Sequence, residues 1–253
     1  ILMNYTDCPI CSSSTTFLDV VDFNKSCEEL NGKYLPLSGT PIYYRICDSC
    51  NFVFAPEICS WDDGTFLEKI YNEDYIKVDP EYLIDRPRKT SEILLKKLGI
   101  NHVQVRHLDY GGGNGLLSKI LSEDGWRSES YDPFFNSKTS IRELGKFNLI
   151  TCFEVFEHVP NPKKLISDLV LLMDDSCLVM FSTVLNDRKI EKNKRIDWWY
   201  ASPRNGHISL YSRKSIEILT SDKNLIFGSF NEGFHYILKP PVPEWASHLI
   251  QTS

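Results

Sequence analysis

Residues 101–253 alternate between short apolar runs and longer amphipathic stretches. A buried strand is a short, nearly continuous apolar run, whereas a helix covering a sheet repeats its apolar residues every three or four positions. The strand-like runs are VRHLDY at 105–110, SESYDPF at 128–134, FNLITCFEV at 147–155 and CLVMFSTVL at 177–185, and the helical stretches are LLSKILSEDG at 116–125 and NPKKLISDLVLLM at 161–173. This alternation predicts an α/β fold, a mostly parallel sheet with helices on both faces.

The flanking segments predict further elements and a division of the chain. Residues 61–100 have a helical pattern, with Ile93, Leu94 and Leu98 on one face and Gly99 as a stop signal. After an aromatic and polar stretch at 186–211, a helix is expected at 212–224, followed by strands at 225–230 and 235–240. We expect an N-terminal module at 1–60, a helical connector at 61–100 and the α/β domain at 101–253.

Two cysteine pairs lie near the start of the chain. Cys8 and Cys11 are two residues apart, as are Cys47 and Cys50, and this spacing lets a tight turn aim two sulfurs at one ion. The segments at 15–23, 43–47 and 51–56 are rich in β-branched and aromatic residues and predict strands. Together they predict a small zinc-ribbon-like β module with structural Zn²⁺. The alternatives are four unrelated thiols or one redox-active pair.

Composition and charge narrow the class of protein. With 42% apolar and 25% charged residues, the 253-residue chain is typical of a globular protein. Its longest apolar runs fall short of the roughly 18 residues that cross a bilayer, and its first residues lack the features of a secretory signal. A cytoplasmic protein without membrane contact is therefore expected. The net charge of -6 argues against a nucleic-acid partner, and the oligomeric state is open.

A glycine-rich loop follows the first strand of the α/β region. In LDYGGGNG, Asp109 is followed by Gly111, Gly113 and Gly115, but Leu116 stands where a dinucleotide fingerprint requires glycine. Glycines here allow positive φ and bring the backbone close to a ligand. Asp132, at the end of the next strand, suits hydrogen bonds from two ribose hydroxyls. The pattern indicates a nucleoside-containing ligand other than NAD.

These motifs carry a family resemblance. LDYGGGNG, YDPF and FNLITCFEVFEHVPNP resemble class I S-adenosylmethionine-dependent methyltransferases of the methyltransferase-23-like branch, with a Rossmann-like fold. With the four-cysteine module ahead of them, they further resemble the sugar C-methyltransferases. The resemblance implies S-adenosylmethionine as cofactor, bound by Asp109, Gly111, Gly113, Asn114, Gly115, Asp132, Phe153 and Glu154.

Two departures from the pattern stand out. Only residues 133–146 separate Asp132 from Phe147, so the usual third strand and helix are expected to be shortened or missing. The sugar C-methyltransferases also carry a Glu-His pair where this chain has Gly206 and His207. A carbon-acid mechanism would therefore need another residue, Tyr75 or Glu157.

The aromatic loop at 186–211 contains the candidate chemistry. An oxygen acceptor must lose a proton, and histidine is the natural base near neutral pH. His207 is the first candidate for general base, with His158 and Tyr75 as further catalytic candidates. Acceptor contacts are expected from Trp198, Trp199, Tyr200 and Arg204. The alternatives are that His158 only braces its loop and that the aromatic side chains only cover the sheet.

The expected function is methyl transfer to a small molecule, such as a sugar, a nucleotide sugar or another secondary metabolite. Two alternatives remain open at this stage. One is an RNA methyltransferase with a zinc module, and the other is a non-catalytic adaptor that binds S-adenosylmethionine.

Overall fold

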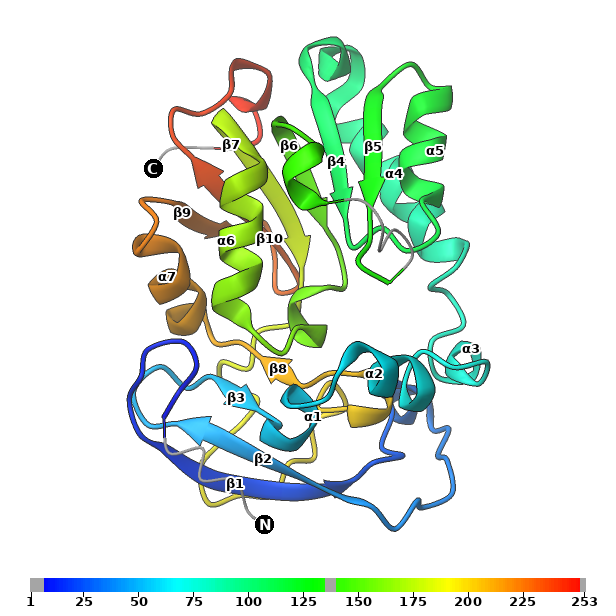
Figure 1. Ribbon diagram of the computed structural model, residues 1–253, viewed down its shortest axis with the longest axis vertical. Coiled ribbons are helices and arrows are strands. Elements are labelled where there is room, and N and C mark those ends of the chain that lie inside the picture. The colour runs from blue at the N-terminus through cyan, green and yellow to red at the C-terminus, as the bar shows by residue number, and fades with distance from the viewer. Residues whose placement is uncertain (1–6, 135–139, 251–253) are drawn as a thin grey trace. The chain divides into compact units, whose positions relative to one another are not determined.

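The computed structural model describes residues 7–134 and 140–250, and the chain forms two compact units (Figure 1). Unit 1 comprises residues 1–80, 156–164 and 183–219, and unit 2 comprises residues 81–155, 165–182 and 220–253. Two segments from the middle of the chain thus belong with the N-terminal residues. The expected modules are continuous stretches of sequence that end at residues 60 and 100, whereas the compact units are defined by contacts in space. The expected division therefore stays a prediction.

Unit 2 is built on a six-stranded sheet in the order β5-β4-β6-β7-β10-β9. Its strands are β4 (Arg106–Tyr110), β5 (Arg127–Tyr131), β6 (Phe147–Cys152), β7 (Met173–Ser182), β9 (Ile226–Ser229) and β10 (Phe234–Lys239). The pairs β4–β5, β4–β6 and β6–β7 are parallel, whereas β10 runs antiparallel to both β7 and β9. This is the expected Rossmann-like α/β sheet, and the predicted fold class is confirmed.

Helices connect and cover these strands. α5 (Leu116–Glu123) follows β4 and α6 (Pro162–Leu172) precedes β7, and α4 (Asp85–Leu98) leads into the sheet through the 3₁₀ turn η2 (Gly99–Gln104). Figure 1 shows α4 and α5 beside β4 and β5. Leu94 and Leu98 of α4 join Leu117 and Leu121 of α5 in one buried cluster with Trp126. Burial of these apolar faces fixes both helices on the sheet.

The connection from β5 to β6 is short, as expected. Its described part contains only the 3₁₀ turn η3 (Ile141–Glu143), which starts with a capping box between Ser140 and Glu143. The strand β5 therefore forms one edge of the sheet. Because β5 and β6 lie on opposite sides of β4, the order in which strands are added to the sheet reverses between β4 and β6. Open α/β sheets bind ligands at the carboxyl ends of the strands at such a point.

Unit 1 contains a four-stranded antiparallel sheet in the order β1-β2-β3-β8. The strands are β1 (Thr15–Asp22), β2 (Pro41–Cys47), β3 (Val53–Phe54) and β8 (Ser209–Leu210). The last strand comes from the segment after β7 and pairs Leu210 with Val53. Tyr44 adds a hydrogen bond from its hydroxyl to the carbonyl of His207 at 2.7 Å. The N-terminal module is thus completed by residues about 160 positions away.

Short helices complete unit 1. They are α1 (Pro56–Cys59), α2 (Asp63–Lys69), α3 (Tyr75–Val78) and α7 (Arg213–Ser221), which extends into unit 2, with 3₁₀ turns η1 (Cys27–Asn31), η4 (Phe156–His158) and η5 (Pro203–Asn205). A last 3₁₀ turn, η6 (Glu244–Ala246), belongs to unit 2. None of the helices in the two described ranges has the length and apolar character that a membrane crossing requires.

Candidate cofactor and metal sites

The glycine loop of unit 2 has little room for side chains. Gly111 has φ of 75°, and a Cβ there would collide with the side chain of Val155. A Cβ on Gly112 would collide with the hydroxyl of Ser130 and the carboxylate of Asp109. The motif did not predict a need for glycine at position 112, because the φ of Gly112 is not positive. Glycine is needed there only because neighbouring side chains leave no room for a Cβ. The loop backbone can therefore approach a ligand closely.

Asp132 holds this loop through its carboxylate. Its Oδ2 accepts a hydrogen bond from the backbone N–H of Gly113 at 3.0 Å, and its Oδ1 accepts one from Phe134 N–H at 2.8 Å. The side chain is buried, and it faces the loop from the end of the neighbouring strand β5. Each carboxylate oxygen can accept a second hydrogen bond, so the pair can also receive two hydroxyl donors.

Asp109 lies at the end of a buried hydrogen-bond chain. The Thr151 hydroxyl donates to Asp109 Oδ1 at 2.7 Å and lies 2.8 Å from His107 Nε2. Because the hydroxyl proton goes to Asp109, the His107 Nε2–H must donate to Thr151. Burial lowers the pKa of His107 to about 3, so this ring is neutral. Burial, with the added repulsion from Asp132, raises the pKa of Asp109 to about 6.

Glu154 follows β6 in a left-handed backbone conformation, with φ of 53°. Its N–H donates to Ser182 Oγ at 2.8 Å, and the Ser182 hydroxyl donates back to Glu154 Oε1 at 2.7 Å. A non-glycine residue persists in this conformation only when its surroundings fix it, and such residues cluster at functional sites. Ser182, at the end of β7, carried no sequence signal for this role.

The predicted cofactor residues all belong to unit 2. Asn114 supports the loop, because its side-chain amide donates to the Leu83 carbonyl at 3.3 Å and its Oδ1 accepts from Leu116 N–H at 3.1 Å. Phe153 packs against Phe234, with ring centroids 5.7 Å apart. The carboxyl ends of β4, β5 and β6 thus gather residues that the sequence spreads over more than 40 positions. Their contacts to a cofactor stay a prediction.

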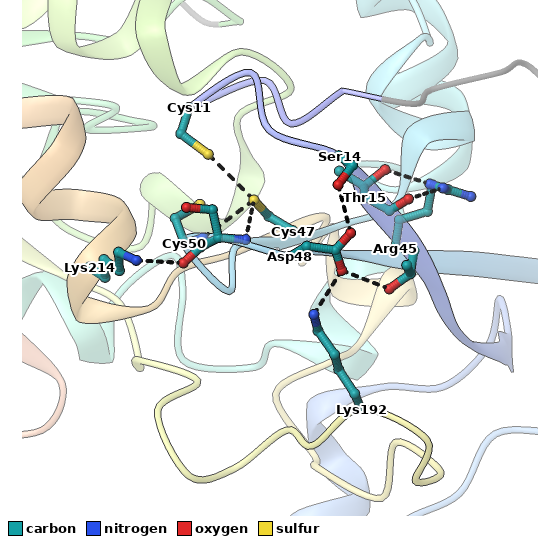
Figure 2. Close-up of polar contacts among 11 residues, drawn as sticks. Cys11, Ser14, Thr15, Arg45, Cys47, Asp48, Cys50, Lys192 and Lys214 are labelled. Atoms are coloured by element: carbon teal, nitrogen blue, oxygen red, sulfur yellow. Dashed lines mark hydrogen bonds and ion pairs between the residues drawn. The ribbon is translucent and has the colours of Figure 1, made fainter.

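The four cysteines of the two pairs come together in unit 1. Figure 2 shows three of them, Cys11, Cys47 and Cys50. Cys8 Sγ lies 3.7 Å from Cys50 Sγ, and Cys11 Sγ lies 3.4 Å from Cys47 Sγ. A disulfide would require about 2.05 Å, whereas a tetrahedral zinc site with Zn–S bonds of about 2.3 Å places its sulfurs about 3.8 Å apart. The four sulfurs all lie within 4.8 Å of one another, so their arrangement fits a four-thiolate metal site.

Backbone and charged groups surround these sulfurs. The N–H groups of Ser49 and Cys50 both point at Cys47 Sγ at 3.4 Å. Two lysines from later in the chain bind this turn, as Figure 2 shows. Lys214 Nζ donates to the Ser49 carbonyl at 2.7 Å, and Lys192 Nζ forms an ion pair with Asp48 at 2.7 Å. These donors and cations favour thiolate ligands near the turn.

The thiols cannot all ionise easily without a cation. The hydrogen bond with Cys50 lowers the pKa of Cys8 to about 5, and the same contact raises the pKa of Cys50. One sulfur of the pair therefore holds its proton so that the other can be a thiolate. A divalent ion would remove this conflict, because metal binding displaces thiol protons.

His207 and His158 lie together with Glu157 in unit 1. One ligand atom from each of the three side chains lies within 4.8 Å of the other two. His207 Nδ1 lies 2.8 Å from the Tyr200 carbonyl, and the Tyr200 hydroxyl donates to Glu157 Oε1 at 2.7 Å. A carbonyl only accepts hydrogen bonds, so His207 Nδ1 carries the proton and Nε2 holds the lone pair.

The other catalytic and acceptor candidates have structural contacts of their own in unit 1. Tyr75 is buried, with its hydroxyl 3.4 Å from the Asn205 carbonyl. Arg204 donates to the Ile70 carbonyl at 3.0 Å, and Trp198 is buried against Tyr200. Trp199 also packs on Tyr200, edge to face, with centroids 5.2 Å apart. Tyr200 was expected to contact the acceptor. In the structure, both tryptophans pack on its ring.

Comparisons with known proteins agree with this architecture. Residues 82–225 match the model of the methyltransferase domain family. Because the match covers more than half of the chain, the chain belongs to this family. The expected class, an S-adenosylmethionine-dependent methyltransferase domain of class I, is confirmed.

The similar proteins share only part of their length with this chain. The ubiquinone biosynthesis O-methyltransferase of Colwellia psychrerythraea is 30% identical over 90 residues, which cover 36% of this chain and 35% of that protein. The protein of the same name from Coxiella burnetii is 29% identical over 99 residues, 30% of this chain and 42% of its own. This chain therefore spans about a third to two fifths of these curated relatives.

Solved structures give a partial likeness. The magnesium protoporphyrin IX methyltransferase from Synechocystis PCC 6803, with bound SAH, is 14% identical with a TM-score of 0.48. The alignment covers 70% of this chain and all of that protein.

Proposed function

We propose that this protein transfers a methyl group from S-adenosylmethionine to a hydroxyl of a small organic acceptor. The observation that carries the proposal is the loop in unit 2 where Asp132 holds the Gly113 N–H beside buried Asp109, at the point where the strand order reverses. Family membership supports the cofactor, and the names of the curated relatives, which are O-methyltransferases, favour an oxygen acceptor. A sugar, a nucleotide sugar or another secondary metabolite fits the proposal.

Each predicted cofactor residue has a defined task in the proposal. Asp132 would accept hydrogen bonds from the ribose hydroxyls, since its oxygens keep acceptor capacity beyond their two backbone bonds. Ionised Asp109 would attract the ammonium of the methionine part. Glycines 111, 112, 113 and 115 would leave room for the ligand. When bound, S-adenosylmethionine supplies an activated methyl group whose leaving group is a neutral thioether.

His207, the base candidate of the aromatic loop at 186–211, would carry the proton chemistry. An acceptor hydroxyl must lose its proton as the new carbon–oxygen bond forms, and we assign this proton to His207 Nε2. The Tyr200 carbonyl keeps Nδ1 protonated, so Nε2 is the basic nitrogen. Glu157, within 4.8 Å, would stabilise the resulting imidazolium. His158 contacts the His207 ring edge to face, with centroids 4.9 Å apart, and would orient it.

The four-cysteine cluster completes the proposal as a structural zinc site. All four ligand positions are occupied by cysteine sulfur, so such a site has no open position for catalysis. The ion would join the two turns of the N-terminal module and fix the ends of β1 and β2.

One experiment separates methyl transfer from the alternatives. The protein is incubated with methyl-labelled S-adenosylmethionine and a panel of hydroxylated metabolites, RNA and cell protein. Label in one metabolite supports the proposal, label in RNA would establish the nucleic-acid alternative, and cofactor binding without labelling would favour the adaptor.

The same assay tests His207 once an acceptor is labelled. His207→Ala should reduce turnover by about 10² to 10⁴ while cofactor affinity stays unchanged, as expected for a positioned base. His248→Ala, which removes an exposed histidine of unit 2, is the matched control. Full turnover in His207→Ala would mean that the histidine only supports its loop.

A further inference from the structure

The cluster in unit 1 has the donor set of a transition-metal site. Glu157 and His158 are neighbours on the turn η4, and His207 follows the turn η5 about 50 residues later. We propose that these three side chains bind one divalent transition-metal ion of the zinc, cobalt or iron(II) class, separate from the four-cysteine site. We further propose that a bound ion blocks the basic nitrogen of His207. Only this second part rests on the proposed function.

The donor atoms of Glu157, His158 and His207 are of the right type, and lie close enough together, to bind one metal ion. Two imidazoles and one carboxylate form a ligand set that binds zinc or iron(II) and leaves coordination positions open. The three ligand atoms lie within 4.8 Å of one another. A tetrahedral ion with metal–nitrogen bonds of about 2.1 Å needs ligand atoms about 3.4 Å apart, so shifts of about 1 Å in the side chains suffice.

Tyr200 orients two of the three proposed ligands. Its carbonyl accepts the His207 Nδ1–H at 2.8 Å, and its hydroxyl donates to Glu157 Oε1 at 2.7 Å. Metal-bound histidines usually donate their other N–H to a carbonyl or carboxylate, and metal-bound carboxylates are themselves hydrogen-bonded. One residue therefore selects the Nε2 lone pair of His207 and holds the carboxylate.

Burial of the ligands and the backbone conformation of Gly206 also favour a metal site. Glu157 is fully buried and His207 is 4% exposed, whereas His158 is partly buried. Gly206 has φ of 85°, and a Cβ there would lie 3.0 Å from His158 Nδ1 and 3.3 Å from Ile70 Cγ2. Glycine at this position thus lets His158 lie against His207. A cation beside Glu157 would also offset the cost of burying its charge.

The proposed ion would compete with the proton. Nε2 of His207 has a single lone pair, so a nitrogen that binds a metal cannot take a proton from an acceptor hydroxyl. The proposed function requires that lone pair. Occupancy of this second site should therefore slow methyl transfer, and removal of the ion should restore it.

Cobalt spectroscopy tests the site without knowledge of the acceptor. The protein is first loaded with one equivalent of Zn²⁺ to fill the cysteine site, and Co²⁺ is then titrated. We expect one further equivalent, with ligand-field bands of nitrogen and oxygen ligands and without thiolate-to-cobalt charge transfer. Proton NMR should show hyperfine-shifted ring signals from two histidines. A protein that takes up no second equivalent overturns the proposal.

Variants assign the ligands. Glu157→Gln and His207→Ala should lose the second equivalent, and Tyr200→Phe should weaken it by about 10- to 100-fold, the usual effect of an outer hydrogen-bond partner. Glu232→Gln and His248→Ala, both exposed, are the matched controls. Circular dichroism checks folding, and if a variant does not fold, the NMR signals of the parent protein still decide. Unchanged cobalt binding in folded Glu157→Gln and His207→Ala would refute the site.

Activity decides only the second part of the proposal. With a labelled acceptor in hand, the second equivalent of cobalt should reduce methyl transfer at least about tenfold. Cobalt binding with undiminished turnover would disprove the block while leaving the site intact. If no acceptor is ever labelled, the proposed function fails, and the cobalt spectra still confirm or refute the metal site.

Discussion

Replacing Asp132 by alanine is the sharpest test of the proposed cofactor site. The carboxylate accepts hydrogen bonds from Gly113 N–H at 3.0 Å and Phe134 N–H at 2.8 Å, and it has acceptor capacity left for ribose hydroxyls. A hydrogen bond to a charged group contributes about 1.5 to 3 kcal/mol. Loss of even one such bond should raise the dissociation constant roughly 10- to 150-fold, since about 1.4 kcal/mol is a factor of ten, so this range is the minimum effect expected.

Alanine also leaves two backbone N–H groups without their acceptor, so part of the effect could come from a loosened loop. Asp132→Asn separates these causes, because it keeps a carbonyl oxygen for one N–H but removes the charge and one acceptor. Isothermal calorimetry with S-adenosylhomocysteine should give asparagine an affinity between those of the parent and alanine. Thermal unfolding of the free proteins reports the loop effect. An alanine variant that binds within twofold of the parent would refute the role of Asp132.

The remaining predictions concern metal, pH and the loop. Elemental analysis of the purified protein should find one zinc per chain when the second site is empty, and none in Cys47→Ser. Chelation should lower the melting temperature of the parent protein. The pKa of Asp109 is raised to about 6 in the free protein, so its charge is present above that pH and is lost below it. Cofactor affinity should therefore fall about tenfold per pH unit below 6, and calorimetry of Asp109→Asn should show no such dependence. Gly112→Ala should reduce both stability and cofactor affinity, because its Cβ would overlap Ser130 and Asp109; a thermal melt like that of the parent would contradict this steric reasoning.

Local patterns in the sequence were sufficient for the sheet of unit 2 and for two groups of neighbouring residues, the four cysteines and the glycine loop with Asp132. Apolar runs and helical repeats predicted its strands, because burial of one face imposes a period that the chain itself displays. The two cysteine pairs predicted a four-sulfur cluster, since each pair lies in one tight turn. The glycine loop and Asp132 were found in the same way, as neighbouring strand ends of a parallel sheet meet at one edge.

The contacts between distant segments were decided by the tertiary structure. Strand β8 completes the N-terminal sheet through two backbone pairs, and a two-residue strand has no period that a sequence can display. Ser182 fixes Glu154, and Tyr200 joins Glu157 to His207, across gaps of 28, 43 and 7 residues. Hydrogen bonds of this kind depend on where packing brings each side chain. The sequence thus determined which side chains are available as candidate ligands, whereas the packing of the folded chain decided which of them meet.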